Sequence, residues 1–196
     1  AAHVAAPASG AVQWIEDCHG DTYDAWVGNG NVYTVSHAHY CGNIGGFPQS
    51  DPWSVNMRHA LAFTTSANTT IGHDPLGYYD WYGNPAPAMI NWFPDLAVGS
   101  FTGQTQAAWT VAGNGSYVVL GGEFPSVNGT AQQGLVRFAV RSIASNKSGP
   151  QYAASQINPT VVAVAGAARV SWQANTDRDD KSLTYTLTRD GQTVFT

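Results

Sequence analysis

An internal repeat is the feature of this sequence that most constrains its fold. The turn Gly28-Asn29-Gly30 and the apolar run behind it recur, 85 residues later, from Gly113 onward. Short apolar runs separated by Gly/Asn turns are typical of β-strands and not of helices. A repeated set of landmarks in one order predicts repeated structural units. We therefore expect two superposable β-units, Val12–Phe63 and Ile90–Phe138, with Trp26 equivalent to Trp109 and Phe63 to Phe138.

The composition narrows the classes of partner. Charged residues make up 11% of the chain, against a usual share of roughly 25%, and the formal net charge is −5. A chain of this kind without Lys/Arg clusters has no electrostatic attraction for nucleic acid or for an anionic membrane. No apolar run is long enough to cross a bilayer. We expect neither nucleic-acid binding nor membrane insertion.

The only two cysteines are Cys18 and Cys41. They flank the first strand pair of the first repeat, where adjacent strands could bring them together. In a Gly/Asn/Thr-rich, Lys-poor chain the expected state is a disulfide, which indicates an extracellular protein. Two free thiols, or a thiolate metal ligand, are the alternatives that the sequence leaves open.

The chain divides into four segments. We expect an irregular leader over Ala1–Gly10, a repeat region over residues 11–145 and a polar linker over residues 146–152, where Gly149-Pro150 is a turn signal. Residues 153–196 alternate in period 2 over three predicted strands, 160–164, 168–172 and 183–189. About 45 residues with one apolar face need a covering sheet from outside the segment.

Two segments of the chain resemble known protein families. Trp172, Leu183-Thr184-Tyr185 and Arg189-Asp190-Gly191 are similar to the first half of a fibronectin type III domain. The run Tyr117–Phe124, with the closing strand Leu135–Phe138, resembles the delta-60 propeller-like repeats of large secreted actinobacterial surface proteins. The first repeat departs from that pattern at Ser36–His39.

The resemblance implies an all-β fold: propeller-like antiparallel blades, here two repeats, plus a truncated fibronectin type III-like β-sandwich. It also implies a piece of a large secreted or cell-wall-associated protein that acts as a scaffold and binding module for glycans or in cell adhesion. The expected partners are glycans or other cell-surface proteins. The remainder of the parent chain, or another copy, is expected to complete residues 153–196.

A histidine group in the first repeat is the candidate metal site. His37 and His39 are two residues apart on a predicted strand and share a face, and His19 lies in the loop that Cys18 would tie to Cys41. Such a set could bind zinc or copper, with calcium as a further candidate ion. The alternative function is then a secreted metal-dependent hydrolase or oxidase. Otherwise these are hydrogen-bonded histidines, and no cofactor is expected.

An aromatic-rich segment around residues 72–87 is the candidate ligand site. Aromatic faces on a loop stack on sugar rings, while Asp and Asn bind sugar hydroxyls. The alternative is that the rings cover the core of the loop itself. The predicted ligand-binding residues are Tyr78, Tyr79, Asp80, Trp81, Tyr82 and Asn84.

The sequence assigns no catalytic residue. Glu16, Asp17 and Glu123 include the carboxylates that a glycosidase pair would need, but nothing in their spacing indicates that they meet.

Overall fold

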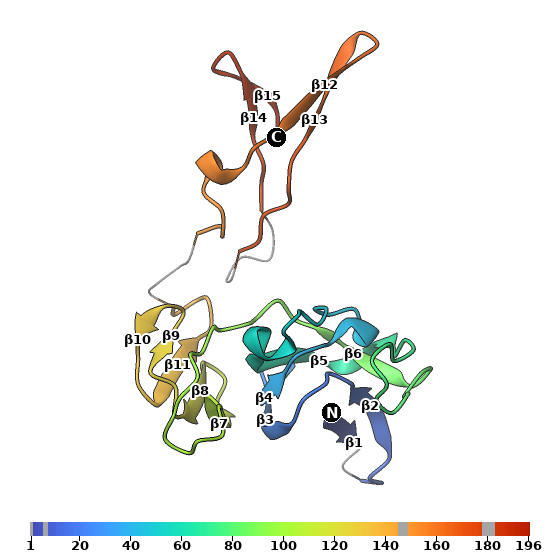
Figure 1. Ribbon diagram of the computed structural model, residues 1–196, viewed down its shortest axis with the longest axis vertical. Coiled ribbons are helices and arrows are strands. Elements are labelled where there is room, and N and C mark those ends of the chain that lie inside the picture. The colour runs from blue at the N-terminus through green and yellow to red at the C-terminus, as the bar shows by residue number, and fades with distance from the viewer. Residues whose placement is uncertain (1, 6–7, 145–148, 178–182) are drawn as a thin grey trace. The chain divides into compact units, whose positions relative to one another are not determined.

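A computed structural model shows an all-β chain of several antiparallel sheets, none of which closes on itself (Figure 1). It describes residues 2–5, 8–144, 149–177 and 183–196. The chain separates into two compact units, residues 1–144 and 145–196. Among the described residues, no helix is both long and apolar enough to cross a membrane.

The N-terminal unit contains two larger sheets and two small ones. One larger sheet has the order β3-β4-β5-β6 and the other the order β11-β8-β7, while β1 pairs with β2 and β9 with β10. The strands are β1 (Ala2–Ala5), β2 (Val12–Glu16), β3 (Thr22–Gly28), β4 (Asn31–Ala38), β5 (Arg58–Thr70), β6 (Pro85–Met89), β7 (Ala108–Gly113), β8 (Tyr117–Gly122), β9 (Ser126–Val127), β10 (Thr130–Ala131) and β11 (Leu135–Ala139), with the short 3-10 helices η1 (Gly42–Ile44) and η2 (Trp53–Asn56) between β4 and β5.

The irregular leader expected over Ala1–Gly10 is wrong for residues 2–5. These residues form β1, which pairs antiparallel with β2 from Ala2↔Glu16 to Ala5↔Val12. Strand pairing depends on backbone N–H and C=O groups, so a short segment without an alternating pattern can still pair when the edge of another strand lies beside it. Residues 1, 6 and 7 of the leader lie outside the described residues.

Both faces of the sheet β3-β4-β5-β6 pack against a hydrophobic core. Successive side chains of a strand point to opposite sides of the sheet, so one strand can contribute to both cores. Val35 of β4 and its partner Ala60 of β5 pack in a core shared with β7, β8 and the segment around Phe124. Leu61 and Phe63 of β5 point the other way, into a second core with the two cysteines. A strand buried on both sides tolerates few polar residues, which explains the apolar run of β5.

The two larger sheets meet along β3 and β7. Asp24 of β3 accepts hydrogen bonds from the Thr110 hydroxyl (2.7 Å) and the Val111 backbone N–H (2.9 Å) of β7. Burial by itself raises the pKa of Asp24, but these hydrogen bonds and one from its neighbour Ala25 outweigh it and lower the pKa. The rings of Tyr23 and Trp109 pack across the same seam, 4.8 Å apart.

The hairpins β3–β4 and β7–β8 share one irregularity. In the first, Thr22 pairs with Ser36 and Asp24 with Val35, which leaves Tyr23 as an extra residue. In the second, Ala108 pairs with Gly122 and Thr110 with Gly121, which leaves Trp109 as the extra residue. Such a bulge bends the strand and re-aims its side chain.

This register corrects one predicted equivalence and supports the other. Trp109 corresponds to Tyr23 and not to Trp26, because each is the extra residue of its bulge. The pair Val27↔Val32 then matches the pair Gly113↔Val118, with the same number of residues between the partners in both hairpins. On the opposite side of the central strand the expected match is present, since Val32 pairs with Phe63 and Val118 with Phe138.

The C-terminal unit consists of two separate hairpins, β12–β13 and β14–β15, with the short 3-10 helix η3 (Ala154–Gln156) before them. Their strands are β12 (Thr160–Val164), β13 (Ala167–Ser171), β14 (Leu187–Arg189) and β15 (Gln192–Phe195). The strand predicted over 183–189 is therefore formed only at its end.

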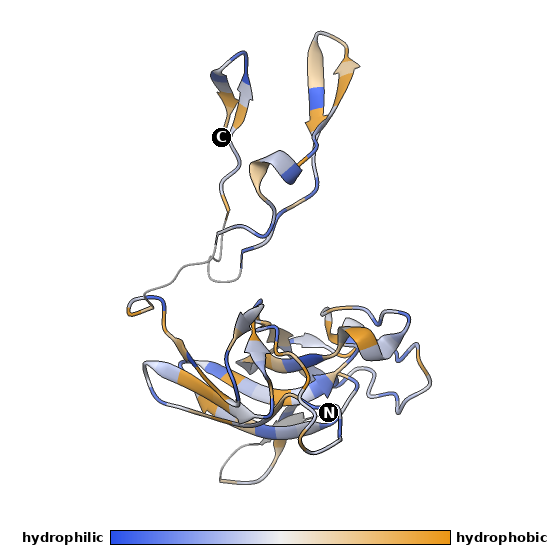
Figure 2. Ribbon diagram, turned by 60° about the vertical axis from the view of Figure 1, so that its left-hand side comes forward, coloured by the Kyte–Doolittle hydropathy of each residue, from blue (hydrophilic) through white to orange (hydrophobic). Residues whose placement is uncertain are grey.

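Apolar side chains of these hairpins remain in contact with solvent. Figure 2 shows hydrophobic stretches along both hairpins, and Val161, Val162 and Phe195 are all exposed. Trp172 and Tyr185 are half-buried against each other, with ring centroids 5.5 Å apart. Within its described residues, this unit is not a sandwich with a buried core.

Candidate functional site

The aromatic segment forms a closed loop between β5 and β6. At its base the Ile71 N–H donates to the Asn84 carbonyl (2.9 Å), and the Gly83 N–H donates to the Ile71 carbonyl (3.0 Å). We call residues 72–84 the aromatic loop. Because its ends are hydrogen-bonded together, the loop leaves and rejoins the sheet at one place.

Two aspartates organise the interior of the aromatic loop. Asp74 accepts from the backbone N–H groups of Leu76 (2.8 Å) and Tyr78 (3.0 Å). Asp80 accepts from the N–H groups of Asp74 (3.3 Å) and Tyr82 (3.1 Å). Aspartates that bond their own backbone in this way mimic turns and fix loop conformation.

The charge state of both aspartates follows from these contacts. The side-chain hydrogen bond with His73 (2.8 Å), together with the backbone bonds, lowers the pKa of Asp80. For Asp74, burial alone raises the pKa, but the backbone N–H donors of Leu76, Tyr78 and Gly77 more than compensate and lower it. Both carboxylates are therefore ionised at neutral pH.

The loop presents three tyrosines to solvent. Tyr78, Tyr79 and Tyr82 are 56%, 71% and 58% exposed. Tyr82 stacks on the ring of His73 with centroids 3.7 Å apart and planes 8° apart. The ring of Tyr79 lies 4.6 Å from that of Trp81.

Trp81 and Asn84, the other predicted ligand-binding residues of this loop, stabilise its conformation. Trp81 is partly buried against the second core, as the alternative interpretation of the loop expected for its rings. Asn84 donates from its side chain to the Trp81 carbonyl (2.8 Å). The segment thus combines one inward ring that anchors it with three outward rings that are available to a ligand.

A buried histidine joins the aromatic loop to the disulfide segment. Nε2 of His19 lies 2.7 Å from Oδ2 of Asp74, and both side chains are almost completely buried. Burial lowers the pKa of His19, so its ring is neutral at neutral pH. The Tyr78 ring covers this pair, 4.2 Å from the His19 ring.

The three histidines predicted as metal ligands do not gather at one point. The rings of His19 and His39 are 5.9 Å apart, and His39 donates from Nδ1 to the Gln49 side-chain oxygen (2.8 Å). His37 is engaged elsewhere, with Tyr23 and Gln106 at Nδ1 and the Asp21 N–H at Nε2. The shared face fails because β4 ends at Ala38, so His39 does not continue the strand's alternation.

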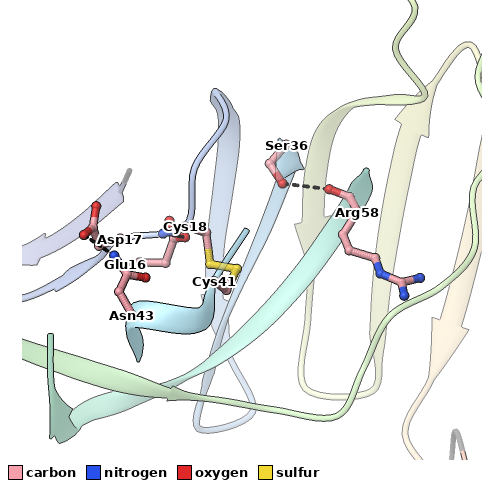
Figure 3. The surroundings of a disulfide bond; sticks show 7 residues. All are labelled: Glu16, Asp17, Cys18, Ser36, Cys41, Asn43 and Arg58. Atoms are coloured by element: carbon pink, nitrogen blue, oxygen red, sulfur yellow. Dashed lines mark hydrogen bonds between the residues drawn. A yellow bond between two sulfur atoms is a disulfide. The ribbon is translucent and has the colours of Figure 1, made fainter. Parts of the chain in front are cut away.

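Cys18 and Cys41 form the predicted disulfide, beside two buried carboxylates (Figure 3). Glu16 accepts from the Cys18 N–H (2.9 Å), and Asp17 accepts from the Asn43 side-chain amide. Burial is the main cause that raises the pKa of Asp17, to about 6.

Side chains of metal-ligand type also converge in this cluster. Within the described part of the chain, Glu16, Cys18 and Cys41 are the only group of three such side chains whose ligand atoms lie within 4.8 Å of one another. Both sulfurs are used by the disulfide, so the group holds no thiolate. A metal at the three histidines stays a prediction to which no contact in the structure adds support.

The carboxylates considered for glycoside hydrolysis belong to different places. Glu123 bonds to the hydroxyl and backbone N–H of Thr102 and accepts from the Trp109 indole (3.0 Å). Glu16 and Asp17 lie at the disulfide.

The sequence analysis missed Asp74 and Trp53. The sequence signals for these two residues were the Asp-Pro pair at 74–75 and the aromatic residue directly after Asp51-Pro52.

No protein-family model, curated protein or solved structure matches this chain. Function must therefore be argued from the residues of the site.

Proposed function

We propose that this chain is a scaffold and glycan-binding module of a larger extracellular or cell-surface protein. The observation that carries the proposal is the aromatic loop: three exposed tyrosines on a segment that its own hydrogen bonds hold in place. Tyrosine faces offer apolar area to the C–H face of a sugar, and each hydroxyl adds a polar contact. A loop fixed in advance loses little conformational freedom on binding.

The setting supports an extracellular scaffold. A disulfide persists in oxidising compartments and is rare in the cytosol. The sheet β3-β4-β5-β6 lies between two cores, as a propeller-like blade lies between its neighbours. The exposed apolar side chains of the C-terminal hairpins suit a fibronectin-like sandwich whose second sheet comes from further chain or another copy.

The alternative function, a metal-dependent hydrolase or oxidase, has no comparable observation in its favour. His37 has partners of its own, away from the other two histidines. We therefore propose no reaction.

The test is binding of the whole chain to a panel of soluble polysaccharides by affinity gel electrophoresis. Tyr78→Ala, Tyr79→Ala and Tyr82→Ala should each weaken retardation by the polysaccharide that the wild type binds. Phe101→Ala is the matched control, because Phe101 is 94% exposed but lies outside the aromatic loop. If no polysaccharide retards the wild type, or if the three variants migrate as it does, the proposal is wrong.

A further inference from the structure

Another exposed aromatic ring lies beside the aromatic loop but belongs to a different part of the chain. Trp53 begins η2, in the connection between β4 and β5, and is 47% exposed. Its ring centroid lies 4.9 Å from that of His39. Tyr78 of the aromatic loop lies 6.2 Å from the same imidazole. Two exposed rings from two loops therefore lie against one buried histidine.

Both rings pack on side chains that are themselves held in place. The His39 imidazole is held by Gln49, and the His39 N–H donates to the His19 carbonyl (2.9 Å). The Tyr78 ring packs on the His19 ring, and Nε2 of His19 contacts the carboxylate of Asp74 in the aromatic loop. Residues on both sides of the disulfide thus tie the two loops together.

Trp53 and Tyr78 are two separate stacking platforms. Each of Trp53 and Tyr78 contacts His39, but no ring contact joins the two to each other among the described residues. A stacked ring pair has centroids about 4.5–7 Å apart, so the two platforms lie farther apart than the rings of one such pair. A ligand that stacks a different sugar unit on each platform has at least two sugar units.

The charge around the platforms selects among such ligands. Asp51 stands two residues before Trp53, Asp80 lies in the same loop as Tyr78, and the whole chain has a net charge of −5. Carboxylate or sulfate groups on a glycan would be repelled by like charges at this surface.

We propose that Trp53 and Tyr78 are two stacking subsites for separate sugar units of an uncharged, extended polysaccharide. This inference rests on the proposed glycan-binding function and adds to it a minimum ligand length, a charge class and a residue outside the aromatic loop.

The test compares affinity with ligand length by isothermal titration calorimetry. The probes are oligosaccharides of one to six units from uncharged glucans, xylans, mannans and chitin, with oligogalacturonides as the anionic series. For the wild type, affinity for the preferred uncharged series should rise roughly tenfold or more from one to four units, because a second stacked ring adds a contact. Trp53→Ala should lose this rise while affinity for the monosaccharide is unchanged. Trp53→Phe, which keeps an aromatic ring, should retain most of it.

The outcomes separate the two proposals. If Trp53→Ala keeps the wild-type dependence on length while Tyr78→Ala loses binding, the second subsite is wrong and the proposed function stands. If oligogalacturonides bind best, the charge class is wrong. If none of the probes binds, or Tyr78→Ala binds as the wild type does, the glycan-binding function fails and this inference with it. Thermal unfolding of each variant, compared with the wild type, excludes loss of binding through misfolding.

Discussion

Replacing Asp17 by asparagine should stabilise this protein at neutral pH. The residue is only 4% exposed, and burial raises the pKa of its carboxyl from 3.8 to about 6. The folded state therefore disfavours the ionised form that prevails at pH 7. One pKa unit corresponds to about 1.36 kcal/mol, so a shift of roughly two units amounts to about 3 kcal/mol. Asparagine keeps the side-chain oxygen that accepts the Asn43 amide but carries no charge.

The sign of the effect depends on pH in a defined way. Below the unfolded pKa of 3.8 the carboxyl is protonated in both states, and its ionisation costs the fold nothing. As the pH rises from 3.8 to about 6 the unfolded chain loses its proton before the folded one, so this contribution to stability falls. Above about 6 the loss is complete.

The measurement is the free energy of unfolding in urea at pH 4, 5, 6, 7 and 8, followed by near-UV circular dichroism. The difference between Asp17→Asn and the wild type should grow from about 0.5 kcal/mol at pH 4 to about 3 kcal/mol at pH 8. Asp51→Asn, an exposed change of the same type, is the control. A difference that is independent of pH, or a variant that loses stability as the pH rises, would refute the reasoning.

Three further predictions concern the scaffold. Replacing both cysteines of the disulfide by serine frees a 23-residue loop and should lower the free energy of unfolding by roughly 3 kcal/mol in urea titrations; an unchanged midpoint would contradict this. Phe63→Ala empties a fully buried position and should cost about 3–5 kcal/mol by the same measurement. Gly122→Ala should lower the melting temperature, because its Cβ would overlap the Ala107 carbonyl, whereas Gly115→Ala has open space around it and should not; equal melting temperatures would show that the backbone yields there.

The local part of the fold could be predicted from the sequence, because turn signals act over a few residues. The turns at Gly28 and Gly113 lie at the ends of β3 and β7, as the Gly-Asn-Gly pattern indicated. The equivalence of the tryptophans could not be predicted. It depends on where the bulge falls in each hairpin, and a one-residue change in register moves every side chain to the other face.

The candidate site likewise has a part that the sequence predicts and a part that it does not. A segment rich in Tyr, Gly and Pro predicts an exposed aromatic loop, and the exposed rings of Tyr78, Tyr79 and Tyr82 lie there. That Trp81 points inward depends on a core assembled from distant strands. The contact of Trp53 with a histidine 14 residues earlier arises from the path of the chain through η1 and η2, for which the sequence has no local signal.

The closure of the aromatic loop has a consequence for how such a protein can diversify. The pairing of β5 with β6 reaches Thr70↔Pro85, directly beyond the hydrogen bonds that join Ile71 to Gly83 and Asn84. The intervening segment can therefore be exchanged for one of another length or composition while the strand register is kept, provided that the new segment supplies a partner for His19. If the proposed function is correct, exchange of this one surface segment would alter the tyrosines offered to a ligand and leave the sheets and the second platform at Trp53 unchanged.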